Sequence, residues 1–159
     1  MDVGSFDIDH DRLQRGVYVS RKDYLAGHCV TTFDVRMKLC NQEPPIDMPA
    51  VHTLEHLLAV YMRSSESGAA EELIYIGPMG CRTGMYMIMK GDLAPEDVLD
   101  LLRRAYKSVM DFTGDVPAAA SATCGNYLEH NLTLAKWESR RYHDEVLMDM
   151  KPENMTYPA

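Results

Sequence analysis

The sequence predicts an α+β fold in which helices pack on one face of a mostly antiparallel sheet. One stretch, residues 33–39, alternates apolar and polar side chains as a strand does. Two longer stretches, residues 51–61 and 93–112, repeat apolar residues at the spacing of a helix. The predicted order is strand, helix, two strands and then helices. This lack of regular strand–helix alternation favours the α+β class.

The first predicted strand, residues 33–39, reads FDVRMKL. Side chains of a strand point alternately to its two faces, so we expect one buried face and one wet face here. The following segment, residues 41–49, contains three prolines in NQEPPIDMP. Because proline cannot sit inside a helix or a central strand, this segment is predicted to be a loop.

The loop leads into a predicted helix of three to four turns that ends in the Ser/Gly-rich stretch SSESG, residues 64–68. Its apolar residues fall at helical spacing: Val51, Leu54, Leu57, Leu58 and Tyr61. Two short apolar runs, residues 73–76 and 85–89, then flank the stretch GPMGCRTG. Glycine and proline bound these runs, which are predicted to be strands.

The second predicted helix lies in LAPEDVLDLLRRAYKSVMDF, residues 93–112. Its first turn contains Pro95 and two acidic residues, which are all favourable at a helix N-terminus. Its apolar face consists of Val98, Leu101, Leu102, Ala105 and Val109. A last helix is predicted for residues 133–148.

Composition limits the class of protein. With 159 residues, 46% of them hydrophobic, the chain is expected to form a single domain over residues 1–159. A net charge of −8 argues against nucleic-acid binding, which depends on neutralising phosphates. No apolar stretch approaches the roughly 20 residues of a membrane span. The acidic N-terminal stretch lacks a signal-type apolar core, so the expected location is the cytoplasm.

The four cysteines form no CxxC pair and no disulfide-dense pattern, which fits a reducing compartment. Cys29 and Cys40 flank the strand at residues 33–39 and are interpreted as structural. Cys81 lies between glycines and next to Arg82, a cation able to lower the pKa of a thiol. The local pattern supports two interpretations of Cys81 equally: a reactive thiol, or a cysteine that merely fits a tight turn.

Two histidines and a glutamate occupy the first turns of the helix at residues 51–61. Residues four apart lie on one helix face, about 6 Å apart, so His52 and His56 can direct ring nitrogens at one metal ion. Glu55 lies beside them, and HxxEH is the spacing of a class of zinc enzymes in which the glutamate moves protons. The alternative is a histidine pair at the solvent edge of a core helix. The apolar neighbours favour the metal, because three polar groups need partners when buried.

A metal site needs a third ligand, and Cys124 in ATCGNYLEH is the first candidate. It lies among small residues, where a thiolate can approach a metal unhindered. Two imidazoles and one thiolate leave a fourth tetrahedral position open for water or substrate. His130 is the second candidate. The alternative for Cys124 is a buried core thiol.

Five segments closely resemble the S-ribosylhomocysteine lyases, the LuxS family that makes the precursor of autoinducer-2. In order, and with matching separations, they are SFDIDH, FDVR, HTLEHLLAVYMR, GPMGCRTG and CGNYLEH. HTLEH alone is a moderate signal, but the five together span nearly the whole chain. The protein is therefore identified as similar to this family.

The resemblance implies a metal-dependent carbon–sulfur lyase that acts as a homodimer with its active sites at the subunit interface. Family members hold a divalent metal, natively Fe2+ and often Zn2+ or Co2+ when isolated, with residues that match His52, His56 and Cys124. They convert S-ribosyl-L-homocysteine into L-homocysteine and 4,5-dihydroxy-2,3-pentanedione by carbonyl migration and β-elimination. Residues matching Glu55 and Cys81 move the protons.

By the same resemblance, the expected substrate contacts are Ser5, His10 and Arg36. One departure is Tyr75, because the family typically has an aspartate shortly before the PMGC motif. This puts in doubt how the amino-acid end of the substrate is held. The tail KPENMTYPA, residues 151–159, fits no assignable pattern.

Two rival functions remain open at this point. A metallopeptidase with an HxxEH helix normally has a carboxylate as third ligand and a much longer chain. A non-enzymatic protein with a structural zinc would close the site with four protein ligands, adding Cys81 or His130. The number of protein ligands distinguishes a structural zinc protein, with four, from a lyase, with three and an open position.

Overall fold

The computed structural model describes residues 6–158, and its first elements form a β-hairpin. Strand β1 (Gly16–Leu25) pairs antiparallel with β2 (His28–Arg36), and the two-residue turn between them has positive φ at both positions. Neither β1 nor residues 28–32 were predicted as strand. The outer half of the hairpin is largely exposed, so it carries little of the apolar alternation on which such a prediction depends.

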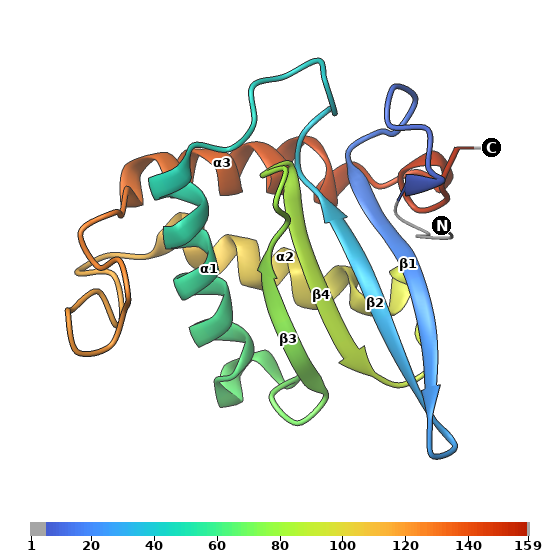
Figure 1. Ribbon diagram of the computed structural model, residues 1–159, viewed down its shortest axis with the longest axis horizontal. Helices are drawn as coiled ribbons and strands as arrows, with labels where there is room; N and C mark the ends of the chain where they lie inside the picture. Colours follow the sequence, from blue (N-terminus) through green and yellow to red (C-terminus); the bar gives the residue numbers. More distant parts are fainter. Residues whose placement is uncertain (1–5, 159) are drawn as a thin grey trace.

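Two further strands complete the sheet, and both were predicted correctly. Strand β3 (Leu73–Pro78) pairs antiparallel with β4 (Gly84–Lys90), and β4 pairs antiparallel with β2. The strand order is therefore β1-β2-β4-β3 (Figure 1). The tight connection between β3 and β4 presents Cys81 at one end of the sheet.

Three α-helices follow the predicted order: α1 (Met48–Met62), α2 (Pro95–Asp111) and α3 (Leu132–Glu145). In Figure 1, α2 and α3 lie behind the sheet and α1 lies alongside β3. The predicted α+β fold with helices on one face is confirmed. Within the described chain, no helix has the length and apolar character required to cross a bilayer.

Short 3-10 turns complete the chain. They are η2 (Ser65–Ser67), η3 (Leu147–Asp149) and η4 (Pro152–Asn154). Helix α3 ends at Glu145 and η3 follows, so the predicted helix over residues 133–148 is three residues too long. The main core lies between the helices and the sheet, and its fully buried members include Phe33, Val35, Leu54, Leu58, Met85, Met87, Leu102 and Tyr106.

The expected wet face of residues 33–39 is a wrong prediction. Asp34, Arg36 and Lys38 are only 1%, 2% and 4% exposed. A second cluster packs beside Asp34 and Arg36, and Lys38 is buried against α3. The members of the cluster are Ile8 and Leu13 from the N-terminal segment, Tyr18 from β1, Cys40 from the following loop and Tyr157 from the C-terminal tail. The buried charges are tolerated because they are paired, Asp34 with Arg36 and Lys38 with Glu138.

Candidate active site

The first two turns of α1 carry His52 and His56, and their rings lie close together. The ring centroids are 4.7 Å apart and the planes meet at 89°. The lone pair of an imidazole nitrogen lies in the plane of its ring, so two perpendicular rings can direct their lone pairs at one point. The predicted convergence of these two histidines is therefore present.

Carbonyl groups of the loop between α2 and α3 orient both rings. The Nδ1 of His52 donates to the carbonyl oxygen of Glu129 at 2.8 Å, and the Nδ1 of His56 donates to that of Pro117 at 2.7 Å. A carbonyl oxygen only accepts, so each Nδ1 carries a proton, and in the neutral ring Nε2 is then the nitrogen with the free lone pair. This is the tautomer that metal-binding histidines adopt.

The same loop places Cys124 beside the histidines. Its Sγ lies 3.3 Å from the Nε2 of His52 and accepts from the backbone N–H of Asn126 at 3.4 Å. A short turn holds the cysteine in place, with its own N–H donating to the carbonyl of Ala120 at 2.9 Å. Three candidate ligands that lie up to 72 positions apart in the sequence thus meet at one place.

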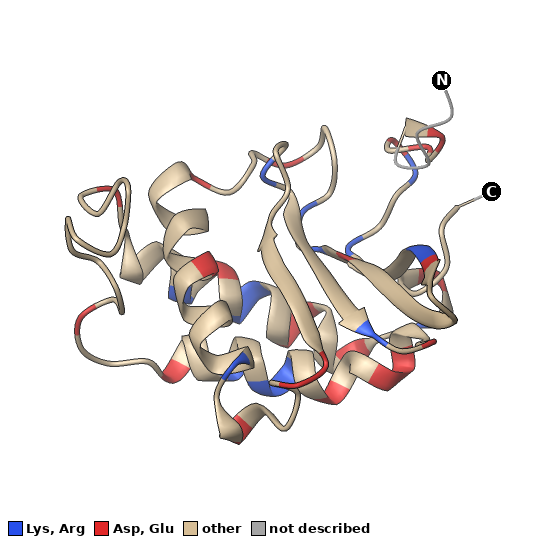
Figure 2. Cartoon of the chain, turned by 60° about the horizontal axis from the view of Figure 1, so that its bottom comes forward, with Lys and Arg blue, Asp and Glu red and all other residues tan. Residues whose placement is uncertain are grey.

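The loop that brings Cys124 to α1 contains no lysine or arginine between residues 112 and 131. In Figure 2 this loop, drawn at the left, is tan and red only. A cation bound here would therefore meet no fixed positive charge from the loop, and the acidic residues would attract it.

A third imidazole, His130, also faces this cluster. One ligand atom from each of His52, His56, Cys124 and His130 can be chosen so that all four lie within 4.8 Å of one another. The Nε2 of His130 is buried and has no hydrogen-bond partner within residues 6–158. Burial and the two neighbouring imidazoles lower the pKa of His130, so its ring is neutral at pH 7.

Thr53 connects His130 to α1 and was missed in the sequence analysis. Its buried hydroxyl donates to the carbonyl of Pro49 at 2.9 Å and accepts from the N–H of Asn131 at 3.0 Å. The Nδ1 of His130 lies 3.0 Å from the same oxygen. Because the hydroxyl proton is already used, Nδ1 donates and Nε2 is bare. The signal available in the sequence was a polar residue at a core position of the helix, next to His52.

This donor set fits a divalent cation. Bare imidazole nitrogens and a cysteine sulfur are the groups that Zn2+ and Fe2+ bind. In addition, the buried Nε2 of His130 accepts no hydrogen bond from the described part of the protein. A buried polar atom normally has a partner, so this nitrogen indicates room for a bound group. Glu55, one residue before His56, is partly exposed, and no hydrogen bond to its carboxylate is found in the described part of the chain. It is free to act on a bound molecule.

Cys81 is an exposed thiol with an altered pKa. Partial burial would raise its pKa, but hydrogen bonds from Thr83 and the charge of Arg36 outweigh this and lower the pKa below the usual value. The thiol sulfur is 3.0 Å from the Thr83 hydroxyl and 3.9 Å from a guanidinium nitrogen of Arg36. The cation responsible is therefore Arg36. The neighbouring Arg82 instead donates to the carbonyl of Ile46.

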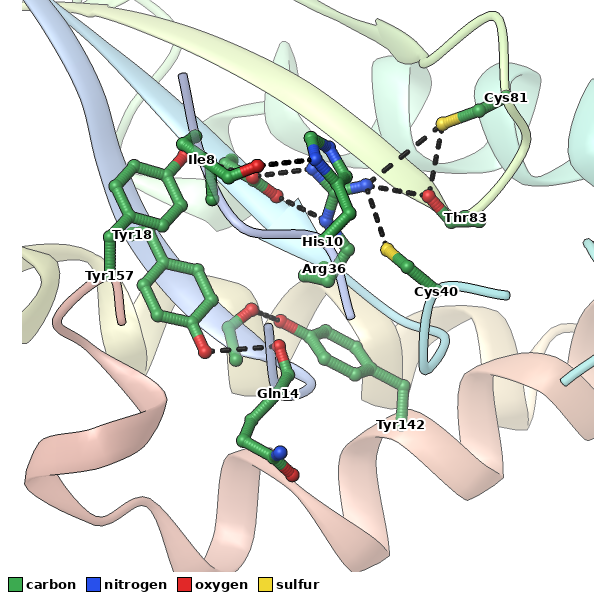
Figure 3. A network of polar contacts seen from close by, with 12 residues as sticks. Ile8, His10, Gln14, Tyr18, Arg36, Cys40, Cys81, Thr83, Tyr142 and Tyr157 are labelled. Atoms are coloured by element: carbon green, nitrogen blue, oxygen red, sulfur yellow. Dashed lines mark hydrogen bonds and ion pairs between the residues drawn. The ribbon is translucent and has the colours of Figure 1, made fainter. Parts of the chain in front are cut away.

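Arg36 is held by protein groups on every side (Figure 3). It makes two hydrogen bonds to the Asp34 carboxylate, at 3.0 and 2.6 Å, and donates to Thr83 at 2.6 Å. We expected a guanidinium open to substrate oxygens, but its side chain is only 3% exposed. Its observed contacts are with Asp34, Thr83 and the two thiols of Cys40 and Cys81.

Two other expected substrate contacts lie in the N-terminal segment. His10 is half-buried, and its Nδ1 donates to the carbonyl of Ile8 at 2.8 Å. This leaves its Nε2 available. Ser5 lies outside the described residues.

The α+β fold and a histidine–cysteine cluster able to hold a metal ion are typical of small metal-binding proteins, and the lowered pKa of Cys81 adds a thiol that ionises more readily than usual. Comparison with known sequences is more specific. The model of the family described as S-Ribosylhomocysteinase (LuxS) matches residues 3–153. The chain belongs to the LuxS family.

Individual relatives named S-ribosylhomocysteine lyase agree with this assignment. The protein from Phocaeicola vulgatus is 52% identical over 99% of this chain and 97% of its own length. The Porphyromonas gingivalis protein is 47% identical, covering 98% of each chain. The Desulfotalea psychrophila protein is 43% identical over 99% of this chain and 98% of its own.

Proposed function

We propose that this protein cleaves S-ribosyl-L-homocysteine into L-homocysteine and 4,5-dihydroxy-2,3-pentanedione, the precursor of autoinducer-2. Membership of the LuxS family supports this function, and so do relatives of full length that carry the lyase name. The structural observation that carries the proposal is the meeting of His52, His56 and Cys124 with both imidazole tautomers set for a metal. The family assignment sets aside the rival metallopeptidase function.

In this proposal His52, His56 and Cys124 hold one divalent metal per subunit, with Fe2+ as the native ion and Zn2+ or Co2+ as substitutes. The bound metal supplies Lewis acidity, which polarises a sugar carbonyl and makes the adjacent carbon–hydrogen bond acidic. The loop carbonyls of Pro117 and Glu129 keep both imidazoles in the ligating orientation.

The reaction requires protons to move between neighbouring carbons without net oxidation. Removal of a proton from carbon 2 of the ribosyl chain and its return to carbon 1 moves the carbonyl to carbon 2, and a repeat moves it to carbon 3. Loss of the carbon 4 proton then expels the homocysteine sulfur from carbon 5 as a thiolate, which takes up a proton. The enol left at carbon 4 becomes a ketone as carbon 5 is protonated to a methyl group. Two acid–base groups are needed, and we assign them to Glu55 and Cys81. The lowered pKa of Cys81 supports its role, because the thiolate is the form that accepts a proton.

Substrate contacts are assigned to Ser5, His10 and Arg36. The bare Nε2 of His10 is suited to accept from a sugar hydroxyl. The guanidinium nitrogen of Arg36 that lies 3.9 Å from the Cys81 sulfur is the one best placed to contact a substrate bound beside the thiol. No metal ligand is proposed among these three.

The protein is proposed to act in the cytoplasm as a homodimer with the active site at the subunit interface. Large apolar side chains next to the metal ligands are exposed, including Tyr127 at 39% and Leu128 at 80%. Across the sheet face that the helices leave open, Tyr75 is 45% exposed and pairs with the half-exposed Ile88. Such apolar surface is typical of a protein interface. Sedimentation equilibrium tests this: a dimer is expected, and a monomer at micromolar concentration contradicts it.

The function is tested by supplying S-ribosylhomocysteine to the metal-loaded protein and measuring free thiol. Release of homocysteine at one equivalent per substrate is expected, together with the dicarbonyl product trapped as a quinoxaline. Absence of thiol above the blank, with metal shown to be bound, rejects the function. Protein stripped of metal with a chelator is the control and should release none.

A further inference from the structure

The C-terminal tail continues past residue 153, where the family match ends, and packs on β1. The Asn154 side chain donates to the carbonyl of Arg15 at 2.9 Å. The backbone of Asn154 lies so close to Gly16 that any Cβ there would clash with it. The tail is therefore fitted to the start of the strand.

Tyr157 is the residue of this tail that reaches the buried charges. Its ring stacks on that of Tyr18, with centroids 4.7 Å apart and planes 8° from parallel. Its hydroxyl donates to the Asp34 carboxylate at 2.9 Å. The hydroxyl of Tyr18 instead points to main-chain carbonyls of Gln14 and Glu153. Only one hydroxyl of the stacked pair touches Asp34.

From Asp34 an unbroken series of polar contacts leads to the Cys81 sulfur. The Asp34 carboxylate forms a bidentate ion pair with Arg36, and the guanidinium donates to the Thr83 hydroxyl at 2.6 Å. That hydroxyl already accepts from Arg36, so its own proton is available to the sulfur 3.0 Å away. Asp34 and Arg36 are 1% and 2% exposed, so water does not screen these contacts.

We propose that Tyr157 is a positioning residue for Cys81, acting through Asp34, Arg36 and Thr83. The positioning of Cys81 by Tyr157 does not depend on the proposed lyase function. Only the acid–base task given to the thiol rests on that function. The assignment of Tyr157 gives the tail, which fits no pattern in the sequence, a part in the active site.

Two effects of the tyrosine hydroxyl have the same sign. By holding Asp34, it fixes the guanidinium in reach of Thr83 and Cys81. By donating to the carboxylate, it takes up part of the negative charge that would otherwise neutralise Arg36. Both effects favour the thiolate. The titratable or charged side chains around Cys81 and the series of contacts that leads to it are Asp34, Arg36, Cys40, Tyr86 and Tyr157, together with Tyr18 and Tyr142 on the far side of Asp34.

The test is the pH dependence of alkylation of Cys81 by iodoacetamide, followed by mass spectrometry of the peptide that contains it. In Tyr157→Phe the ring stays and the hydroxyl is lost. We expect the midpoint to rise by about half a pH unit, which slows alkylation at pH 7 about threefold. Tyr18→Phe removes the neighbouring hydroxyl and should leave the midpoint unchanged.

An unchanged midpoint in Tyr157→Phe overturns the proposal, and so does an equal rise in Tyr18→Phe. If Tyr157→Phe folds poorly, chains that end after residue 157 and after residue 156 make the same comparison. Turnover is measured in parallel. If the wild-type protein has no lyase activity, the proposed function fails, while the alkylation result still decides whether the tail positions the thiol.

Discussion

The imidazole rings of His52 and His130 are stacked, with centroids 4.0 Å apart and planes 22° from parallel. The lone pair of an imidazole nitrogen lies in the plane of its ring. The planes of two stacked rings are nearly parallel, so the two lone pairs do not point at one nearby ion. His52 and His56, whose planes are perpendicular, can point at one ion. In our proposal His52, His56 and Cys124 are the ligands, and His130 is a neighbour that leaves a position open. The rings of His56 and His130 also meet at a steep angle, 70°, so a site with four protein ligands is the alternative.

Replacement of His130 tests this count of ligands. We expect His130→Ala to keep its metal with less than about a tenfold loss of affinity, because it removes packing and the hydrogen bond to Thr53 but no proposed ligand. His56→Ala should lose the metal on dialysis. Competition with a chromophoric chelator measures both, and the Co2+ spectrum reports the geometry. Equal loss in the two variants would mean four protein ligands and would favour a structural metal site.

Glu55 is expected to move protons without binding the metal. Glu55→Gln keeps the shape of the side chain and removes the base, so turnover should fall by at least about a hundredfold with metal content unchanged. Metal analysis and thiol release on the same sample separate the two effects. Loss of metal in this variant would identify the carboxylate as a ligand.

Cys81 should give the lyase reaction an acidic limb in its pH profile. The pKa of Cys81 is lowered, so the thiolate persists below the usual thiol pKa, and activity should fall as pH drops through the lowered value. Thr83→Val removes the hydrogen bond that favours the thiolate and should move this limb to higher pH.

Cys81→Ala should abolish turnover and leave the metal bound. Normal turnover in that variant would mean that the second acid–base group lies elsewhere.

The buried pair of Lys38 and Glu138 should be costly to break. The Nζ of Lys38 lies 2.8 Å from the carboxylate, and the two side chains are 5% and 6% exposed. Lys38→Met leaves an uncompensated buried charge, so we expect the free energy of unfolding to fall by about 3 kcal/mol or more. Adding Glu138→Leu should recover much of this loss. Urea unfolding of the single and double variants measures it, and additive losses would argue against the pair.

Much of the fold could be read from local patterns, and the failures have a common cause. The helices α1 and α2 and the strands β3 and β4 carry their own apolar periodicity, which is visible within each segment. Strand β1 and the buried polar face of β2 do not. The outer half of β1 is largely exposed, and the burial of the polar face of β2 depends on Tyr157 and the N-terminal segment, which are distant from β2 in the sequence.

The candidate site shows the same division. His52, Glu55 and His56 could be found because one helix turn sets their spacing. Arg82 was the wrong cation for Cys81, because adjacency in the chain does not decide which way a side chain points in a turn. Thr53 and Asp34 were missed, since their roles lie in hydrogen bonds to residues brought close only by folding.

By itself, the sequence determined the α+β class, the family and the residue types able to bind a metal, because these depend on spacing and composition along the chain. Tertiary structure decided which nitrogen of each imidazole carries a proton and which cation faces Cys81. The carbonyls that orient His52 and His56 lie 77 and 61 positions away, and only packing brings them within hydrogen-bond distance. Hydrogen bonds depend on distance and direction in space, and the order of residues along the chain does not specify either.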